Sequence, residues 1–126
     1  MLSDSPISPI LLATDLAASR EFYRVTLGLE ILRENDEMVV FKAGGGTKLN
    51  VSKSSIGTAD SQTQATWDVD DLQREVDELR SRGVTIEEYD MPGVKTVDGI
   101  ADMGFAWAAW FVDPGRNVLG LRQLKR

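Results

Sequence analysis

The chain has 126 residues, 42% of them hydrophobic and 27% charged, which is the balance of one soluble globular domain with a buried core. Its formal charge is −6, from 14 basic and 20 acidic residues, and this disfavours a nucleic-acid partner because phosphate binding needs a basic surface. No apolar run approaches the roughly 18 residues of a membrane span, and the N-terminus has no signal-peptide pattern. We therefore expect a cytoplasmic protein with no membrane partner.

The sequence contains neither histidine nor cysteine. Histidine is the commonest imidazole metal ligand and the usual general base near neutral pH, and cysteine supplies thiolate nucleophiles and soft metal ligands. Any catalysis would therefore rest on carboxylates, hydroxyls, amides, lysine, arginine or tyrosine. The absence of cysteine also excludes a disulfide framework.

The first half of the chain predicts a strand, a helix and three further strands. Residues 7–14 are typical of a buried strand, and Asp15 follows as a helix N-cap, with a helix stop near Gly28. Three strand candidates come next, separated by Asn-Asp and Gly-Gly-Gly turns: residues 30–34, 38–42 and 48–53. Residues 7–53 make up this first module.

The second half repeats the same order after a polar linker at residues 54–62. Alternating residues 64–69 predict a half-buried strand, and a helix capped by Asp70 or Asp71 follows, with its apolar face and its terminal glycine at Leu72, Val76, Leu79 and Gly83. The remaining strand candidates are residues 84–89, 106–112 and 117–124. Residues 90–105 are rich in glycine and proline and predict a long loop, which in a small domain is more often functional than idle.

These elements predict an α+β domain over residues 1–126, built from two βαβββ modules at residues 7–53 and 63–126. Right-handed crossovers place each helix on one face of its sheet and leave the other face free. Two such half-sheets side by side form a cupped mixed sheet, and the cup is the expected site. Open strand edges in such sheets predict a homodimer, in which a partner covers them.

Three motifs carry a resemblance to a known family. They are Asp15-Leu16 with Phe22-Tyr23 and Leu27-Gly28 behind it, Val69-Asp70-Asp71-Leu72 at the start of the second helix, and Asp113-Pro114-Gly115-Arg116-Asn117 in the closing hairpin. In this order and spacing they resemble the glyoxalase/bleomycin-resistance/dioxygenase (vicinal oxygen chelate) superfamily over nearly the whole chain. The resemblance implies the fold given above and, in the enzymes of the family, a divalent metal in the cup.

The resemblance also places the family's metal-ligand positions, typically His, Gln or Glu, at Ser8, Asn50, Gln64 and Gly120 of this chain. This set is neutral and one member has no side chain, so it cannot offset the cost of removing water from a divalent ion. We therefore expect no metal and no cofactor, and without histidine the dioxygenase type of site is impossible. Because it lacks these metal ligands, the chain resembles the drug-binding branch of the family, whose dimers sequester a small molecule without transforming it.

Trp110 is the main candidate for a ligand contact besides these positions. If Val112 pairs with Val118 across the hairpin turn, Trp110 pairs with Gly120 and both face the cup. The indole then either forms the apolar floor of a ligand pocket or fills the space left by an absent Glu and closes the pocket.

Each of the other candidate site residues has two possible interpretations. Gln64 and Ser8 are substrate contacts or ordinary polar residues, and Arg122, which shares the face of Gly120, binds a ligand anion or stays solvated. Residues of the 90–105 loop form a lid over the cup or only anchor the loop. Trp67 has the parity opposite to Gln64 and is expected in the core beneath the second helix.

Three functions remain open. The first is a protein that binds or sequesters a small molecule in the cup without a metal. The second is an atypical, metal-independent lyase, isomerase or epimerase of the glyoxalase superfamily, with Asp68 or Tyr89 as a base. The third is an inert structural or interaction module with a filled cup. The first is favoured, and binding is expected rather than catalysis, because the fold offers a concavity while the usual catalytic groups are missing.

Overall fold

The structure is a computed structural model that describes residues 1–59 and 61–126. This part of the chain contains two α-helices and two mixed β-sheets, which confirms the expected α+β class. The backbone divides into two compact units. The first comprises Met1–Asp60 with Asp113–Asn117, and the second comprises Ser61–Val112 with Val118–Arg126. The single domain 1–126 with its two modules stays a prediction.

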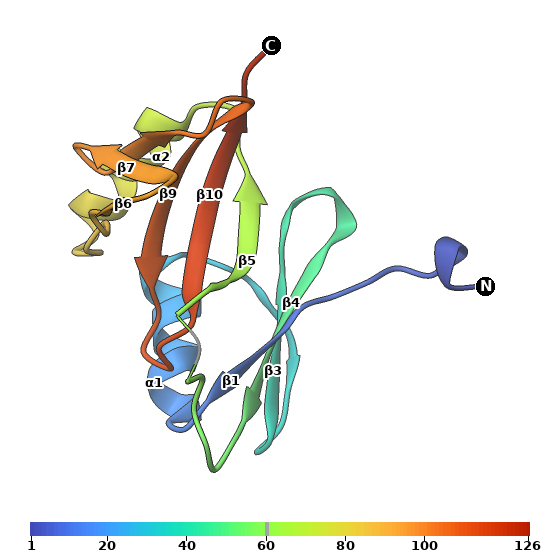
Figure 1. The fold of residues 1–126 in the computed structure, drawn as a ribbon. Helices are drawn as coiled ribbons and strands as arrows, with labels where there is room; N and C mark the ends of the chain where they lie inside the picture. The colour runs from blue at the N-terminus through green and yellow to red at the C-terminus, as the bar shows by residue number, and fades with distance from the viewer. Residues whose placement is uncertain (60) are drawn as a thin grey trace. The chain divides into compact units, whose positions relative to one another are not determined.

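The first unit follows the sequence prediction closely. Its main elements are β1 (Ile10–Ala13), α1 (Leu16–Glu21), β2 (Ile31–Glu34), β3 (Met38–Lys42) and β4 (Lys48–Lys53). Three short helical turns accompany them, η1 (Leu2–Asp4), η2 (Phe22–Thr26) and η3 (Gly44–Gly46). The sheet order is β1-β4-β3-β2, with β1 parallel to β4 and the other pairs antiparallel (Figure 1). The predicted cap is present, because the Asp15 carboxylate accepts a hydrogen bond from Ala18 N at 3.0 Å.

The core of the first unit lies between α1 and one face of this sheet. The strand residues that are buried include Leu11, Ala13, Val39, Phe41, Leu49 and Val51. Because side chains alternate along a strand, the residues between them point to the other face, where Ile10 and Leu12 are exposed. The sheet therefore has one face packed and one face that keeps apolar side chains at the surface.

Two of the sequence motifs meet in a buried polar network within the first unit. The Tyr23 hydroxyl donates to Asp113 Oδ2 at 2.5 Å, and the Asn117 amide donates to the same oxygen and to Leu12 O. Burial, and then the Asp113 charge, raise the pKa of Tyr23 far above its ordinary value. A Cβ at Gly115 would lie 2.6 Å from Leu12 O, so this close approach requires glycine. These contacts give the motifs a structural role.

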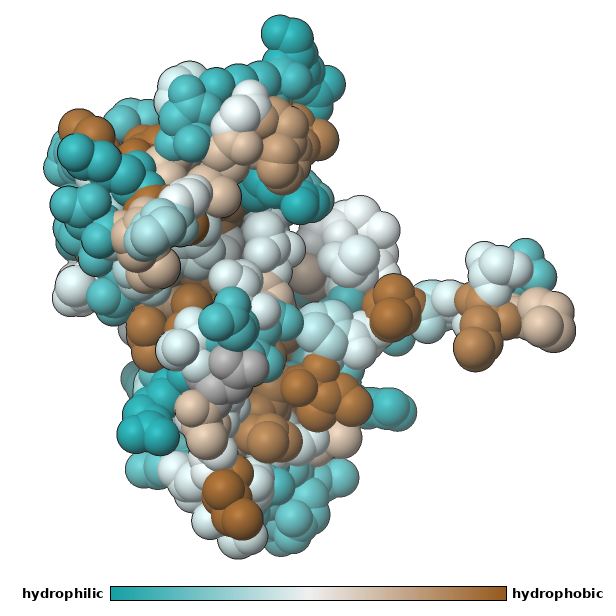
Figure 2. Space-filling model, viewed as in Figure 1, coloured by the Kyte–Doolittle hydropathy of each residue, from teal (hydrophilic) through white to brown (hydrophobic). Residues whose placement is uncertain are grey.

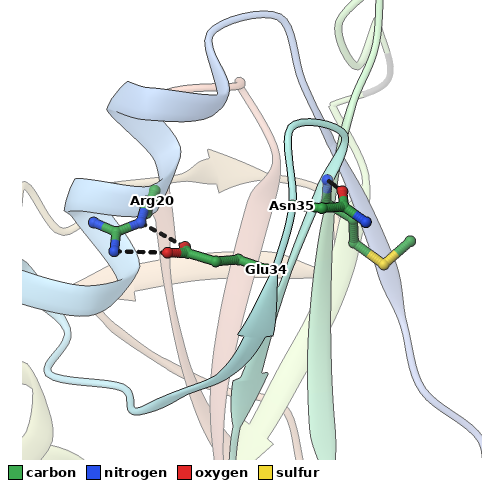
Figure 3. Close-up of polar contacts among 4 residues, drawn as sticks. Arg20, Glu34 and Asn35 are labelled. Carbon is green, nitrogen blue, oxygen red and sulfur yellow. Dashed lines mark hydrogen bonds and ion pairs between the residues drawn. The ribbon is translucent and has the colours of Figure 1, made fainter.

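A side-chain fork joins α1 to β2 at the surface. Arg20 Nε and Nη2 donate to the two carboxylate oxygens of Glu34 at 2.7 and 3.1 Å (Figure 3). At the end of β2 the Asn35 side chain accepts backbone hydrogen bonds from Glu37 and Met38, which closes the predicted turn. The fork is exposed, and exposed ion pairs contribute little to stability.

The N-terminal segment before β1 carries apolar side chains that stay at the surface. Figure 1 shows residues 1–9 leading away from β1, and Figure 2 shows hydrophobic residues along this segment. Leu2 is 88% exposed and Ile7 is 91% exposed. The segment is attached at Pro9, whose carbonyl accepts hydrogen bonds from the backbone and the side chain of Asn50.

The second unit consists of one helix and a six-stranded sheet in the described part of the chain. Its elements are β5 (Thr63–Asp68), α2 (Leu72–Ser81), β6 (Asp90–Met91), β7 (Val94–Val97), β8 (Ile100–Asp102), β9 (Ala106–Val112) and β10 (Val118–Leu124). The strand order is β5-β10-β9-β8-β7-β6, and β5 is parallel to β10 (Figure 1). The α2 helix begins at the predicted cap Asp71 and buries Leu72, Val76 and Leu79 as expected.

Two predictions for the second unit are wrong. Residues 84–89 form no strand, because the backbone bond from Glu87 N to Trp110 O is an isolated contact rather than a ladder. Residues 90–105 are not a loop, since β6, β7 and β8 form a meander there. The glycines that suggested a loop lie in the turns between these strands instead. Asp98 and Gly99 both have positive φ, which is the geometry of a tight two-residue hairpin turn.

Among the described residues no helix is both long and apolar enough to span a bilayer.

Candidate functional site

The second sheet has one face that contacts α2 and a distal face that points away from it. Gln123 Oε1 accepts a hydrogen bond from Leu72 N at the start of α2, so odd-numbered residues of β10 face the helix. Leu119 and Leu121 share that face and are buried. The even-numbered residues Gly120 and Arg122 consequently belong to the distal face.

The strand register places Trp110 on the distal face. Val112 pairs with Val118 and Trp110 pairs with Gly120, as predicted. The Trp110 ring packs edge-to-face against Tyr89, with 5.4 Å between ring centroids and an interplanar angle of 79°. Its indole N–H donates to Thr63 Oγ1 at 3.1 Å, so the orientation of the indole is fixed from both ends.

Two threonines occupy the space beside Gly120, one of the four positions expected for metal ligands. A Cβ added to Gly120 would lie 2.8 Å from Thr66 Oγ1 and 3.3 Å from Thr63 Cγ2. A longer side chain at this position would therefore have to displace Thr66. On the distal face, threonine side chains and the Trp110 indole therefore fill the space around Gly120, and no room is left there for a carboxylate side chain.

Gln64 lies in a β-bulge, which the alternation of polar and apolar residues did not reveal. Thr63 pairs with Val118 and Ala65 pairs with Leu119, so Gln64 is the extra residue of β5. Its side chain is exposed and donates to Gln62 O at 3.0 Å. The bulge brings Thr63 to the Trp110 indole, a contact that sequence reasoning missed because a bulge shifts the parity of the strand.

A surface hollow of about 410 Å³ lies beside Trp110. We call it the aromatic hollow, and its lining residues are Ser61, Gln62, Thr63, Glu87, Tyr89, Met91, Val94, Trp110, Val112 and Val118. Its wall is mainly aromatic and apolar, with a few polar groups, as in small-molecule sites. Met91, from the 90–105 segment that was expected to form a lid or only to anchor the loop, is part of this wall together with Val94 of the neighbouring β7. Partial burial, and then the Glu87 charge, raise the pKa of Tyr89 above its ordinary value.

Arg122 is engaged by its neighbour rather than free for a ligand anion. Its Nε and Nη2 donate to the two carboxylate oxygens of Asp68 at 2.7 and 3.1 Å. The hydrogen bond from Arg122 lowers the pKa of Asp68. Asp68 is therefore a poor general base near neutral pH, because its conjugate acid is too strong.

The four positions expected for metal ligands do not fit a divalent ion. Ser8 is half-buried ahead of β1, and Asn50 donates its side-chain N–H to Pro9 O. Gln64 is turned to Gln62 O, and Gly120 offers no donor atom. Within residues 1–59 and 61–126 no three Asp or Glu side chains gather as a metal-binding group. A neutral amide and hydroxyl set lacks the charge that such ions require.

Residues 7–121 match the model of the Glyoxalase/Bleomycin resistance protein/Dioxygenase superfamily. The chain belongs to this superfamily. The match covers most of both units and agrees with the three motifs in the sequence. Among curated proteins none matches the sequence.

Several solved structures share the fold at low sequence identity. The bleomycin-binding protein from bleomycin-producing Streptomyces verticillus, complexed with copper(II)-bleomycin, is 21% identical, with 100% of each chain covered and a TM-score of 0.76. An antibiotic-binding protein from a Streptomyces species is 20% identical, with 99% of each chain covered and a TM-score of 0.66. Lactoylglutathione lyase from Agrobacterium tumefaciens is 22% identical, with 95% of this chain and 93% of that chain covered and a TM-score of 0.65. The fold is thus shared with two proteins described as binding proteins and with one described as a lyase.

Proposed function

We propose that this protein binds a small organic molecule with an aromatic or apolar body in the aromatic hollow, without a metal and without transforming it. The observation that supports this most directly is the fixed pair of rings, Trp110 and Tyr89, in the wall of the hollow. Aromatic side chains offer a large apolar contact area and need little ordering on binding.

Binding is better supported than catalysis by the state of the candidate bases. The pKa of Tyr89 is raised, which leaves its phenol protonated and unable to accept a proton near neutral pH. The pKa of Asp68 is lowered, and its carboxylate is held by Arg122. The alternatives are a metal-independent lyase or isomerase and an inert module, and the accessible hollow argues against the inert module.

Two of the similar structures are described as proteins that bind bleomycin or an antibiotic, which supports a binding role on this fold. At 20% and 21% identity the likeness extends to the fold alone, so the ligand of this protein has to be sought in its own side chains.

The experiment is to purify the protein without chelator, denature it and analyse the released small molecules by mass spectrometry. The Trp110→Ala variant, purified in parallel, should release less of the same molecule. Elemental analysis of the folded protein should give much less than one equivalent of Zn, Ni, Mn, Fe or Mg. A full metal equivalent would contradict the metal-free proposal, and conversion of the released molecule by fresh protein would indicate an enzyme.

We also propose that the protein assembles as a homodimer. The apolar N-terminal segment, with Leu2 and Ile7 largely exposed, supports this because large apolar side chains are normally covered in the functional assembly. Light scattering should give twice the 13.9 kDa chain mass, and the double variant Leu2→Ser with Ile7→Ser should shift toward the monomer. A monomer at micromolar concentration would contradict the proposal.

A further inference from the structure

The charge of the aromatic hollow is negative. Of the residues that line it, all within the described part of the chain, Glu87 alone carries a formal charge. None of the ion pairs among residues 1–59 and 61–126 includes Glu87. The formal charge of the whole chain, −6, has the same sign.

The side chains of Glu87 and Tyr89 lie on the same side of their segment. Both are half-buried and line the hollow, whereas Val84 and Ile86 are buried and do not line it. The hydrogen bond from Glu87 N to Trp110 O, at 2.8 Å, fixes this segment beside β9. The Glu87 charge contributes to the raised pKa of Tyr89, which agrees with a carboxylate close to the phenol.

The neighbouring Glu88 lies on the other side of the segment. Its Oε1 is 3.6 Å from the position of a Cβ at Gly99, and the Ile86 side chain is 2.8 Å from the same point. Glu88 thus has the charge of Glu87 and adjoins it in sequence, but it is absent from the lining of the hollow.

The cation on the distal face is already neutralised. Arg122 forms two hydrogen bonds with Asp68, and neither residue lines the aromatic hollow. A ligand in the hollow therefore meets two aromatic rings set at 79° to each other and one carboxylate that forms no ion pair. The negative face of an indole or phenol ring attracts a cation, and a nearby carboxylate adds to the attraction.

This inference rests on the proposed function and concerns the class of ligand. We infer that the aromatic hollow takes a flat organic cation, which lies against Trp110 and Tyr89 with its positive charge toward the Glu87 carboxylate. A flat aromatic body gains contact area from the two rings, and a delocalised positive charge is desolvated more easily than a compact ammonium group.

The test uses 10-methylacridinium and acridine, two probes with the same ring system that differ in charge at pH 7.5. Binding is measured by fluorescence titration at low and high salt. We expect the cation to bind at least tenfold more tightly than acridine, with the preference reduced by salt. Glu87→Gln should weaken binding of 10-methylacridinium about tenfold and leave acridine unchanged. The matched control Glu88→Gln should leave both affinities unchanged, and Trp110→Ala should weaken both.

The outcomes separate the two proposals. Equal affinities for the two probes, with no effect of Glu87→Gln, would overturn the inference about charge while binding in the hollow stands. Equal losses with Glu87→Gln and Glu88→Gln would also overturn it, because the preference would then come from net charge alone. If neither probe binds and no small molecule is released from the purified protein, the proposed function fails together with the inference.

Discussion

Trp67 and Trp110 lie on opposite faces of the second sheet, and their indoles have different surroundings. On the face toward α2, Trp67 stacks on the buried Phe111 ring, with 6.1 Å between centroids and an interplanar angle of 17°. On the distal face, Trp110 contacts Tyr89 and Thr63 and lines the aromatic hollow. The same residue type therefore serves packing on one face and a surface cavity on the other. The position of each tryptophan in the alternation along its strand determines the face on which it lies.

The polar groups follow the same division. On the face toward α2, Gln123 satisfies the first backbone N–H of the helix. On the distal face, Thr63, Asp68 and Arg122 bond to neighbouring side chains at the surface. A buried apolar face determines the stability of the unit, whereas a polar and aromatic face is free to adapt to a ligand.

The largest expected effect comes from removing the indole on the helix face. Trp67→Ala should destabilise the protein by about 3 kcal/mol, the lower end of the range for truncated aromatic core residues, because Trp67 is half-buried rather than fully buried. The measurement is the free energy of unfolding from urea denaturation. Trp67→Ala should leave ligand affinity unchanged.

Trp110→Ala is the matched variant on the distal face. It should destabilise by only about 1 kcal/mol, since the half-buried Trp110 ring packs against Tyr89 rather than against the buried Phe111, and it should weaken ligand binding. If Trp110→Ala unfolds the protein and Trp67→Ala is mild, the assignment of the two faces is inverted and the aromatic hollow belongs to the core.

A middle-sized effect is expected at Gly120, on the distal face. Gly120→Ala should destabilise by about 2 kcal/mol, because the new Cβ would lie 2.8 Å from Thr66 Oγ1. Combining it with Thr66→Ala should recover most of the loss. If Gly120→Ala is neutral by urea denaturation, the face has room for a side chain at this position, and a family-type carboxylate would fit there.

The sequence predicted the parity of both tryptophans for a physical reason. The Asp-Pro-Gly-Arg turn fixes the register of β9 against β10, and the pairing of Trp110 with Gly120 follows from it. The register of β5 against β10 likewise places Trp67 on the helix face as expected, although its indole is half-buried rather than fully within the core. Alternation along strands was sufficient wherever the ladder is regular.

The same reasoning failed where the ladder is irregular. Gln64 was expected to contact a ligand, but the bulge places Thr63 against the Trp110 indole instead. A bulge has no clear signature in the sequence of a short polar strand. Glu87 and Val94 were missed as lining residues because residues 84–89 were expected as a strand and residues 90–105 as a loop. The Asp98-Gly99 pair between Val97 and Ile100 was a hairpin signal that could have been used.

The smallest expected effect concerns the fork between Arg122 and Asp68 on the distal face. The hydrogen bond from Arg122 lowers the pKa of Asp68, so the fork contributes stability above the ordinary Asp pKa of about 3.9. That contribution is lost as the pH falls through the lower pKa of the folded protein. Because both side chains are exposed, the effect should be much smaller than that of Trp67→Ala.

Asp68→Asn tests this directly by urea denaturation across pH. The variant should be slightly less stable than the parent at pH 7, and the difference should vanish below the pKa of Asp68 in the folded protein. Its affinity for 10-methylacridinium should match that of the parent, because the fork lies outside the lining of the aromatic hollow. A loss at pH 7 as large as that of Trp67→Ala would contradict the division between the faces, since the distal face would then contribute to folding as the helix face does.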